Sequence, residues 1–430
     1  MKYYLIGIKG SGLSSLAIIL KNLGHEVAGY DDEKKYKFTQ DKLKGIKIYN
    51  QDNDYLKEGV IVIYSSAIKD THKELTKAKE LNLSIYEYME FLGNLTKDYK
   101  LIAVAGTHGK TTTTSMLSTI INPIYGCNYL IGDGSGYASK ENDYFLIEAC
   151  EFKRNFLHYH PKIGVITNVD LDHIGYYKDI DDVKKAFLEF ANNCQDLVVI
   201  YADEDNSKVL ETKTKVIYYG LHQSNDVYAT NIKYSESGIN FSVYINKDFF
   251  FAFSLPFYGE HNLLNSLAVI SVCNYLHIRP EDIQKYLSRF LGATRRFKEV
   301  RVGNNIIIDD YAHHPKEIKA TIEAARQKYP QKKIIAVLEP HTFDRVKVFH
   351  KGFAASLNTA DISYVLDIYS PDNSLNYPGI SVELILQNTV QGHYLKRDCQ
   401  ALRKYKDSVI LFMSPRDTSD LIAKCISFFS

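Results

Sequence analysis

The sequence predicts an α/β protein of three consecutive domains, each built around a mostly parallel β-sheet. Short apolar runs that suit buried strands alternate with stretches of helical periodicity along the chain. Several of these runs end in glycine-rich or acidic turns, as the strands of doubly wound sheets do. A length of 430 residues suggests two to four domains. Breaks in the pattern place the domains at residues 1–98, 99–290 and 291–430.

The composition argues against several classes of protein. A net charge of +1 gives no support for a nucleic-acid surface or a membrane-binding face, and no apolar run reaches the length of a membrane span. The six cysteines are scattered, which fits reduced thiols rather than disulfides or a zinc site. A strand pattern begins at once and leaves no room for a signal peptide. We therefore expect a cytoplasmic protein, monomer or dimer, that binds neither nucleic acid nor membrane.

The first domain opens with a βαβ unit. A strand is predicted at residues 3–8, a helix at 13–23 and a second strand at 26–30. Between the first strand and the helix, Gly10-Ser11-Gly12-Leu13-Ser14-Ser15 nearly matches G-x-G-x-x-G, and Gly7 crowds the same turn. Asp31 follows about 20 residues later, where a ribose-binding acid would lie. The pattern favours a nucleotide site over a structural turn, without saying which nucleotide.

A further strand, predicted at residues 60–64, runs into Ser65 and Ser66. Two hydroxyl groups at the carboxyl end of a strand suit hydrogen bonds to a phosphate. They equally suit the N-cap of a following helix. Both interpretations stay open from the sequence.

The second domain begins with the most informative segment of the chain. A buried strand at residues 101–105 runs into Gly106-Thr107-His108-Gly109-Lys110-Thr111, and a threonine run with Thr112 and a helical pattern follow. A glycine loop between a strand and a helix presents backbone N–H groups and a lysine to an anion. Thr111 is placed to put its hydroxyl group on Mg²⁺. The loop is shorter than the usual G-x-x-x-x-G-K-[ST] motif, yet we expect it to bind phosphate.

Two more strands of this domain end in residues that suit a magnesium–phosphate site. A strand at 144–147 leads into Glu148, and a strand at 163–167 leads toward His173. Because ligands bind at the carboxyl ends of strands in open α/β sheets, we expect both residues to converge with Lys110 on one crevice. A carboxylate and a histidine beside a phosphate loop suit Mg²⁺ held among phosphates. A surface salt bridge and a hydrogen-bonded loop residue are the alternatives.

The end of the second domain combines antiparallel strands with a helix. Residues 226–255 alternate in the manner of antiparallel strands, with a turn near 236–238. Gly259-Glu260-His261 then opens a helix in which Asn262 and Asn265 share one face. This pair suits the edge of a purine, or else a cap and a polar helix face.

The third domain alternates strands and helices again. Arg295-Arg296-Phe297 stands at its entrance. The predicted strands lie at 305–308, 333–338, 362–367 and 409–412, and the predicted helices at 316–327 and 344–357. Two strand ends carry polar strings, DDYAHHP at 309–315 and EPHTFDR at 339–345. The sequence thus predicts another α/β domain with a mostly parallel sheet.

Taken together, these motifs resemble the Mur ligase family across the whole chain. The strings that carry the resemblance are GIKGSGLSSLA (7–17), YSSAI (64–68), AGTHGKTTTT (105–114), TNVDLDH (167–173), GEHNLLN (259–265), ATRRF (293–297), DDYAHHP and EPHTFDR. Their order and spacing are far more specific than any single string. The histidine in the phosphate loop and the DDYAHHP string are similar to the alanine-adding branch of the family.

The resemblance implies a fold and a reaction. The fold is an N-terminal Rossmann-like domain for a UDP-sugar, a central P-loop ATPase-like domain and a C-terminal Rossmann-like domain for an amino acid. The implied reaction is ATP-dependent amide formation that adds L-alanine to UDP-N-acetylmuramate through an acyl phosphate, in peptidoglycan precursor synthesis. The cofactors implied are ATP and Mg²⁺. Phosphorylation supplies the carboxylate with a good leaving group, so the protein mainly positions the partners and neutralises charge.

The resemblance also implies roles for individual residues. The catalytic residues would be Lys110 on the β- and γ-phosphates, Glu148 with Thr111 on Mg²⁺, His173 on a second magnesium ion, and Arg296 on the phosphates. The rest of the ATP site would comprise Gly106, Thr107, His108, Gly109, Thr112, Asn262, Asn265 and Asp310. The UDP-sugar site would comprise Gly7, Gly10, Ser11, Gly12, Asp31, Ser65 and Ser66. His313, His341 and Arg345 would face the amino acid or its acyl acceptor. Because Arg296 and Asp310 lie in the third domain, catalysis would require that domain to close.

Four positions depart from the family pattern. Lys9 stands in the first loop where a glycine or small residue is usual, and Cys150 stands where an aspartate is usual. On the amino-acid side, Met413-Ser414-Pro415-Arg416-Asp417 stands where a Gly-Ala-Gly turn is usual, and Thr342 where an arginine is usual. The alternative function is therefore a Mur-type ligase that adds a different amino acid or a recycled peptide. A non-catalytic scaffold is disfavoured by the intact ATP residues. An NAD(P)-dependent oxidoreductase is disfavoured because it leaves the second glycine loop unexplained.

Overall fold

The computed structural model describes residues 1–32, 42–51, 53–208, 212–370 and 376–429. The chain forms two compact units, one of residues 1–228 with 266–290, the other of residues 229–265 with 291–430. The three domain boundaries predicted from the sequence differ from this division and stay predictions. Each unit is an α/β structure with a mostly parallel sheet, as predicted.

The first sheet lies at the N-terminus, in the order β3-β2-β1-β4-β5, and every pair in it is parallel. Its elements are β1 (Lys2–Ile6), α1 (Ser11–Asn22), β2 (Glu26–Tyr30), β3 (Lys47–Tyr49), β4 (Val60–Tyr64), α2 (Lys73–Glu80), β5 (Ser84–Glu87) and α3 (Tyr88–Leu95). The strand β1 ends two residues before the predicted end, because Gly7 turns to φ +86° and its N–H donates to the carbonyl of Tyr30.

The second sheet of the first unit follows the order β12-β11-β10-β6-β9-β7-β8. Its strands are β6 (Lys100–Ala105), β7 (Cys127–Ile131), β8 (Ser135–Tyr137), β9 (Tyr144–Glu148), β10 (Ile163–Ile166), β11 (Leu197–Tyr201) and β12 (Val216–Gly220). The helices of this part are α4 (Lys110–Tyr125), the 3-10 segment η1 (Phe152–His158), α5 (Ile180–Asn193), α6 (Asp205–Lys208), α7 (Glu260–Tyr275) and α8 (Pro280–Leu287). The parallel order β10-β6-β9 brings the carboxyl ends of these three strands to one edge.

One apolar core extends through the first unit. It contains Tyr3 and Leu5 of β1, the inner face of α1, Ala103 and Ala105 of β6, and Phe187 and Phe190 of α5. The hairpin of β7 and β8 packs closely on α1, since a methyl group at Gly136 would lie 2.6 Å from the carbonyl oxygen of Ser15. The glycine loop that precedes α1 is thus anchored by a buried helix.

The second unit contains three long strands that form the antiparallel end of the chain's middle region and one further α/β sheet. The three strands are β13 (Val227–Ser235), β14 (Gly238–Ile245) and β15 (Asp248–Leu255), of which β14 and β15 pair antiparallel. The turn between β13 and β14 falls at residues 236–237, as the sequence predicts.

The C-terminal sheet follows the order β16-β17-β21-β18-β19-β20. Its strands are β16 (Lys298–Val302), β17 (Asn305–Asp310), β18 (Lys333–Leu338), β19 (Ile362–Val365), β20 (Gly392–Tyr394) and β21 (Ser408–Met413). Its helices are α9 (Pro315–Lys328), α10 (Phe343–Leu357), α11 (Glu383–Leu386), the 3-10 segment η3 (Gln400–Leu402) and α12 (Ser419–Ser427). Only β16 runs antiparallel to its neighbour among the described pairs.

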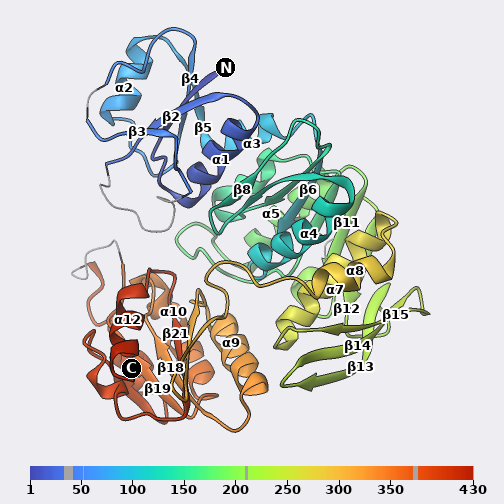
Figure 1. The fold of residues 1–430 in the computed structure, drawn as a ribbon, viewed down its shortest axis with the longest axis vertical. Helices are drawn as coiled ribbons and strands as arrows, with labels where there is room; N and C mark the ends of the chain where they lie inside the picture. The colour runs from blue at the N-terminus through green and yellow to red at the C-terminus, as the bar shows by residue number, and fades with distance from the viewer. Residues whose placement is uncertain (33–41, 52, 209–211, 371–375, 430) are drawn as a thin grey trace. The chain divides into compact units, whose positions relative to one another are not determined.

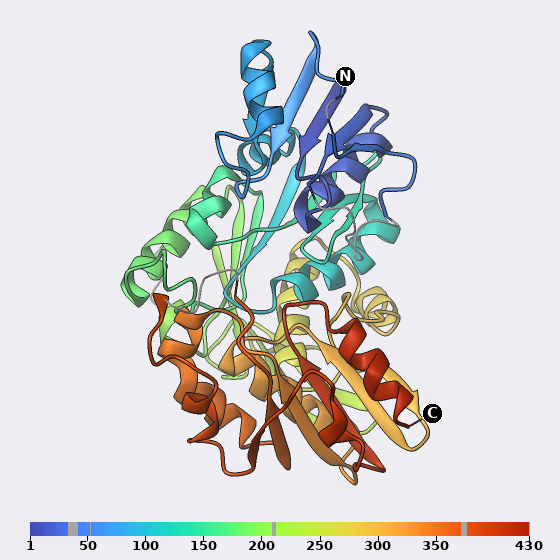
Figure 2. The same ribbon diagram turned by 90° about the vertical axis from the view of Figure 1, so that its left-hand side faces the viewer.

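Helices cover both faces of this sheet (Figures 1 and 2), as expected for a Rossmann-like domain. On one face Ile306 and Ile308 pack with residues of α9 and α10, and on the other Ile307 packs with Leu421 and Cys425 of α12. This alternation along β17 follows from the two-residue period of a strand. Because β17, β21, β18 and β19 are parallel, their carboxyl ends share one edge, and the predicted site residues of this domain lie there.

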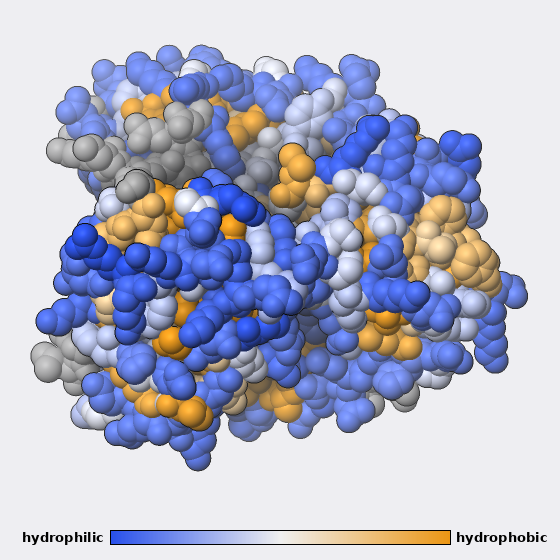
Figure 3. Space-filling view, turned by 60° about the horizontal axis from the view of Figure 1, so that its bottom comes forward, coloured by the Kyte–Doolittle hydropathy of each residue, from blue (hydrophilic) through white to orange (hydrophobic). Residues whose placement is uncertain are grey.

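No helix in the described ranges is long and apolar enough to cross a membrane. The face drawn in Figure 3 is dominated by hydrophilic residues, with hydrophobic residues in small separate groups.

A glutamine of α9 joins the middle region to the C-terminal domain. The side-chain amide of Gln327 on α9 donates to the carbonyls of Ser235 (3.0 Å) and Gly238 (3.1 Å), and its carbonyl accepts from the N–H of Gly259 (2.7 Å). These three bonds help to explain why residues 229–265 belong to the same unit as the C-terminal domain.

Replacing Gln327 by alanine is expected to lower the free energy of unfolding by about 1–3 kcal/mol, because three backbone groups lose their partner. Urea denaturation measures the change. Glu323→Ala on the same helix is the control, since this side chain is exposed and its ion pair with Lys319 contributes little. Equal stability of the two variants would contradict the prediction.

Candidate active site

The phosphate loop connects β6 to α4 through two glycines that no other residue can replace without strain. Gly106 has φ +138°, and a methyl group there would lie 2.0 Å from Oγ1 of Thr167. Gly109 has φ +82° and is the N-cap of α4, so Lys110 and Thr111 are the first two residues of the helix. The loop therefore places its lysine at a helix N-terminus, as the sequence predicts.

Residues at the end of β10 hold the loop in shape. The side chain of Asn168 accepts from the N–H of His108 (2.8 Å) and donates to its carbonyl (3.0 Å). The hydroxyl of Thr107 accepts from the N–H of Asp170 (2.9 Å) and donates to its carbonyl (3.1 Å). The backbone groups of the loop are thus positioned before any ligand binds.

The ammonium group of Lys110 lies in a buried ion pair with Glu151. Nζ is 2.9 Å from Oε2 and 3.3 Å from Oε1 of Glu151, and it also donates to the carbonyls of Gly106 and Thr107. Both side chains are largely buried, at 13% and 3% exposed. Burial acts to lower the pKa of Lys110, but the charges of Glu151 and its neighbours outweigh burial and raise it. Burial acts to raise the pKa of Glu151, but Lys110 and His173 hold it below its usual value.

Glu151 is the site residue that the sequence argument did not single out. It follows β9 by three residues, and Nε2 of His173 lies 3.4 Å from its Oε1. The ring of His173, at φ +52°, rests on Phe152 with 4.7 Å between centroids. The structure thus brings Lys110 and His173 together through a shared carboxylate. The sequence feature that could have indicated Glu151 is a second acidic residue three positions after Glu148, just beyond the end of the same strand.

Glu148 lies beside Thr111 and has a different set of partners. Its Oε2 accepts from the hydroxyl of Thr111 (2.8 Å) and from the N–H of Gly132 (2.8 Å). In the described ranges no group of three or more His, Cys, Asp and Glu side chains is arranged to hold a metal ion. Two adjacent oxygen ligands at a phosphate loop nevertheless fit Mg²⁺, which is usually held by few protein oxygens together with substrate phosphates. Burial raises the pKa of the neighbouring Cys150 thiol to about 12, so it stays protonated.

The first glycine loop is stabilised by a hydrogen bond to the predicted ribose-binding acid, Asp31. Oδ2 of Asp31, which is buried, accepts the backbone N–H of Lys9 (2.8 Å). A methyl group at Gly12 would lie 2.7 Å from the hydroxyl of Tyr88, so the helix start is closely packed. Ser65 accepts the N–H of Ala67 (3.3 Å). These contacts give Asp31 and Ser65 structural roles, and their predicted roles toward a UDP-sugar stay predictions, as do those of Gly10, Ser11 and Ser66.

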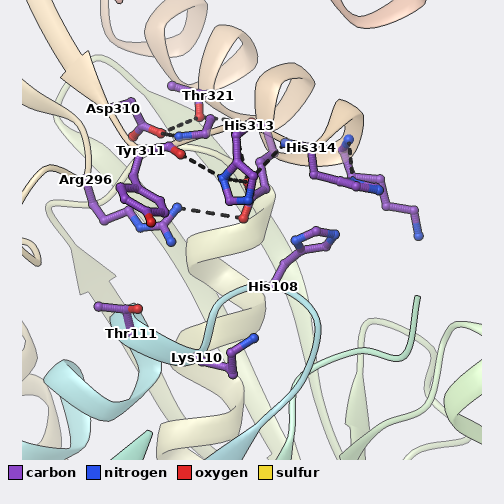
Figure 4. A network of polar contacts seen from close by, with 12 residues as sticks. His108, Lys110, Thr111, Arg296, Asp310, Tyr311, His313, His314 and Thr321 are labelled. Carbon is purple, nitrogen blue, oxygen red and sulfur yellow. Dashed lines mark hydrogen bonds and ion pairs between the residues drawn. The ribbon is translucent and has the colours of Figure 1, made fainter. Parts of the chain in front are cut away.

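In the second unit, Asp310 at the end of β17 ties the entrance segment of the domain to the sheet. Its two oxygens accept the N–H groups of Ala312 and Phe297, both at 2.8 Å, and Thr321 lies beside it (Figure 4). Burial raises the pKa of Asp310 against the opposing effects of the Arg296 charge and of these bonds. The predicted contact with a ribose is not tested by these bonds.

Arg296 and His313 meet on Glu317, the N3 residue of α9. Nη1 of Arg296 is 3.8 Å from Oε1, and Nδ1 of His313 is 3.4 Å from Oε2. The guanidinium of Arg296 also lies over the ring of Tyr311, 5.2 Å from its centroid (Figure 4). His313 bonds the carbonyl of Tyr311 through Nδ1 (3.0 Å). Two predicted site residues are therefore held in one polar network.

The start of α7 carries the predicted purine-facing asparagines. Nδ2 of Asn262 donates to the carbonyl of Tyr258 (2.8 Å), and Asn265 is buried. Burial, with the nearby charge of Arg296, lowers the pKa of His261 to about 4, so this histidine is neutral at physiological pH. The structure leaves the adenine contact of the two asparagines as a prediction.

His341 and Arg345 lie together at the end of β18. Nη1 of Arg345 is 3.1 Å from Nδ1 of His341, and the ring of His341 stacks on Tyr369 with 5.8 Å between centroids. Thr342 caps α10, since its hydroxyl accepts the N–H of Arg345 (3.5 Å). Thr342, which departs from the family pattern, therefore acts as the N-cap of α10.

The fold defines an α/β protein with a glycine loop of the phosphate-binding type, and further α/β sheets precede and follow that loop in the chain. Three family models match the chain: "Mur ligase family, catalytic domain" over residues 2–100, "Mur ligase middle domain" over 104–273, and "Mur ligase, glutamate ligase domain" over 295–416. The chain belongs to the Mur ligase family.

Curated and solved relatives agree with this assignment. The chain is 43% identical over 418 residues to a UDP-N-acetylmuramate–L-alanine ligase of Lactiplantibacillus plantarum. The aligned residues cover 96% of each chain. The crystal structure of a UDP-N-acetylmuramate–alanine ligase from Thermotoga maritima matches with a TM-score of 0.81 at 25% identity, over 100% of this chain and 98% of that one. A murein peptide ligase from Psychrobacter arcticus shares the fold with a TM-score of 0.70 at 23% identity, over 100% and 98% of the two chains.

Replacing Glu151 by glutamine is expected to destabilise the ligand-free protein by about 3 kcal/mol at pH 7, because it leaves Lys110 as an uncompensated buried charge. Since the pKa of Glu151 is lowered by folding, the carboxylate stabilises the fold above the unfolded-state pKa of about 4.3 and loses this effect as the pH falls through the folded-state value. Urea denaturation at pH 7 and well below pH 4 measures the difference from the unaltered protein.

The matched control is Glu189→Gln, which removes an exposed partner of Arg154. It should change stability by no more than about 0.5 kcal/mol at either pH. A Glu151 variant that is as stable as this control at pH 7 would contradict the prediction.

Proposed function

We propose that this chain is an ATP-dependent ligase that adds L-alanine to UDP-N-acetylmuramate, in peptidoglycan precursor synthesis. The observation that carries the proposal is the 43% identity with a curated ligase of that name over 96% of both chains. The intact phosphate loop, with Lys110 and Thr111 at the start of α4, supports it independently. A Mur ligase of Thermotoga maritima has been solved with ADP, which agrees with a nucleotide site in this fold.

The reaction proceeds in two balanced steps. The lactyl carboxylate of UDP-N-acetylmuramate attacks the γ-phosphorus of ATP, so that an acyl phosphate forms and ADP leaves. The amine of L-alanine then attacks the acyl carbon, loses a proton, and expels inorganic phosphate. The protein has little covalent chemistry to perform in phosphoryl transfer, and it acts mainly by positioning and by electrostatics.

Lys110 is the residue we assign to the β- and γ-phosphates. Its ammonium group has three donors, and in the ligand-free chain these are shared among two loop carbonyls and Glu151. Incoming phosphate oxygens are expected to replace part of this set. Glu151 keeps the lysine charged and beneath the loop until then, because it raises the pKa of Lys110.

Thr111 and Glu148 are the residues we assign to Mg²⁺, and His173 to a second magnesium ion. When bound, Mg²⁺ neutralises charge that develops on the transferring phosphoryl group. The 2.8 Å hydrogen bond between Thr111 and Glu148 aligns two oxygen ligands before the metal arrives. The contact of His173 with Glu151 ties its ring to the same end of the sheet.

The remaining assignments follow the family motifs. We assign Gly106 to Thr112 as the phosphate loop, Asn262 and Asn265 to the adenine, Asp310 to the ribose and Arg296 to the phosphates. The loop from Gly7 to Gly12, with Asp31, Ser65 and Ser66, is assigned to the UDP-sugar, and His313, His341 and Arg345 to the amino acid. Because Arg296 and Asp310 belong to the third domain, we expect catalysis to require closure of that domain on ATP, as the family resemblance implies. All six cysteines are free thiols, which agrees with the expected cytoplasmic location. We expect a monomer or dimer.

The substrate assignment is tested by ADP release from ATP in the presence of UDP-N-acetylmuramate and a panel of acceptors. The panel comprises L-alanine, glycine, L-serine and L-alanyl-γ-D-glutamyl-diaminopimelate. We expect L-alanine to give the highest kcat/KM. Turnover with the tripeptide and not with L-alanine would instead support the alternative, a ligase for recycled peptides. No ADP with any acceptor would support a non-catalytic role.

Replacing Lys110 by alanine is expected to reduce ADP release at least about 1,000-fold, because the transferred phosphoryl group loses its main protein cation. The same ADP assay measures it, and circular dichroism checks that the fold is intact. Lys97→Ala is a suitable control, since this lysine is exposed and its ammonium group donates to the side chain of Asn94 (2.8 Å). Turnover retained by the Lys110 variant would remove the loop from the mechanism.

A further inference from the structure

The turn that follows β21 presents an arginine over an aromatic ring. The guanidinium carbon of Arg416 lies 4.6 Å from the ring centroid of Tyr369. The side chain of Arg416 is 42% exposed and Tyr369 is 39% exposed, so a ligand in solution can reach both. A cation stacked on an aromatic face is held in one orientation while its N–H edge stays available.

The backbone of this turn is held by a buried arginine. The guanidinium of Arg295, which is 8% exposed, donates to the carbonyls of Ser414 (2.8 Å), Pro415 (3.1 Å) and Arg416. The N–H of Arg416 in turn donates to the hydroxyl of Ser414 (3.0 Å). Three consecutive carbonyls on one guanidinium leave the turn little freedom. Arg416 therefore projects from a fixed backbone position.

The charge of Arg416 is only partly balanced by the protein. The buried carboxylate of Glu339 is 3.8 Å from Nη1 of Arg416, which is too long for a hydrogen bond. The same carboxylate forms a close ion pair with Arg397 and accepts the hydroxyl of Ser414 (2.8 Å). One carboxylate thus faces two guanidinium groups, and the nearer of the two is that of Arg397.

A second cation lies on the other side of the same aromatic pair. Tyr369 stacks on His341, and Nδ1 of His341 is 3.1 Å from the guanidinium of Arg345. These residues follow β18 and β19, and Arg416 follows β21, all of which are parallel. In this order β18 lies between β21 and β19, so the row from Arg416 through Tyr369 and His341 to Arg345 occupies the edge where α/β sheets bind ligands.

We propose that Arg416 binds the α-carboxylate of the incoming amino acid and so makes the ligase select free amino acids over amines that lack this group. The assignment rests on the proposed function. An arginine offers two parallel N–H donors to a carboxylate, and the fixed turn and the ring of Tyr369 pre-organise them. Because the guanidinium of Arg416 is exposed and makes no hydrogen bond to Glu339, an anion is the ligand that suits it. Arg416 is in this view a specificity-determining residue, and it takes no part in the phosphoryl transfer.

The test compares L-alanine with L-alaninamide as acceptors in the ADP-release assay, at saturating ATP and UDP-N-acetylmuramate. Arg416→Gln is expected to lower kcat/KM for L-alanine by about 10- to 100-fold, mainly through KM, because a charge-assisted bond is lost. The value for L-alaninamide should change by less than about 3-fold, since that acceptor has no carboxylate to lose. The preference for the acid over the amide should thus collapse, and Arg416→Lys should retain part of it.

The matched control is Arg397→Gln, which removes the other guanidinium at Glu339 and leaves the ring of Tyr369 covered. It should keep the preference for the acid. An equal loss for both acceptors in the Arg416 variant would show a structural role and overturn the assignment, as would the same collapse in the Arg397 variant.

Failure of the proposed function has a different signature. An unaltered chain that turns over no acceptor removes the proposed function, and the assignment of Arg416 falls with it. If the unaltered chain prefers glycine or L-serine, only the choice of amino acid is wrong, and the same comparison is made with the amide of the preferred substrate.

Discussion

The buried ion pair between Lys110 and Glu151 is the interaction on which the first unit of this ligase is organised. A lysine beneath a phosphate loop must be charged to bind an anion, yet burial opposes that charge. The carboxylate of Glu151, 2.9 Å from Nζ of Lys110, stabilises the charged form of the lysine against the effect of burial. Such a carboxylate has to come from a strand next to β6, and the order β10-β6-β9 supplies it from the segment after β9. The same carboxylate meets His173 from the segment after β10, so three strand ends share one charge centre.

The phosphate loop is also held in shape by the protein itself. The loop is shaped by Asn168 and Thr107 through backbone bonds that need no phosphate. Lys110 and Thr111 are each occupied by a carboxylate, Glu151 and Glu148 respectively. In the proposed function, phosphate oxygens replace part of the set of acceptors around Lys110, while Thr111 and Glu148 stay side by side as ligands for Mg²⁺. The loss of conformational entropy on ordering these residues occurs during folding, so it does not reduce the affinity for a ligand, which is the general advantage of pre-organisation.

The C-terminal domain also contains buried charged side chains, and these hold the backbone of its loops in place. Asp310 joins the entrance segment to β17, and Arg295 gathers the carbonyls of the turn after β21. Glu339 lies under that turn between two arginines. These three charged side chains, all nearly inaccessible to solvent, fix loops that would otherwise be free. The exposed groups that remain, among them Arg416 and Tyr369, are consequently displayed in defined positions at the ligand-binding edge.

The helices, the strands and the polar residues at the strand ends could be predicted from the residue pattern alone. Gly106, Gly109 and the apolar run before them specify a strand, a loop and a helix start, because glycine conformation and hydrophobic periodicity are local properties. Which of these side chains contact one another depends on the tertiary structure. Glu151 faces Lys110, Asp31 faces the backbone of Lys9, and Arg416 faces Tyr369 because of strand order, which depends on contacts far apart in the chain. A pattern of residue types cannot distinguish an acid that binds a ligand from one that binds its own backbone, since both require the same residue at the same strand end.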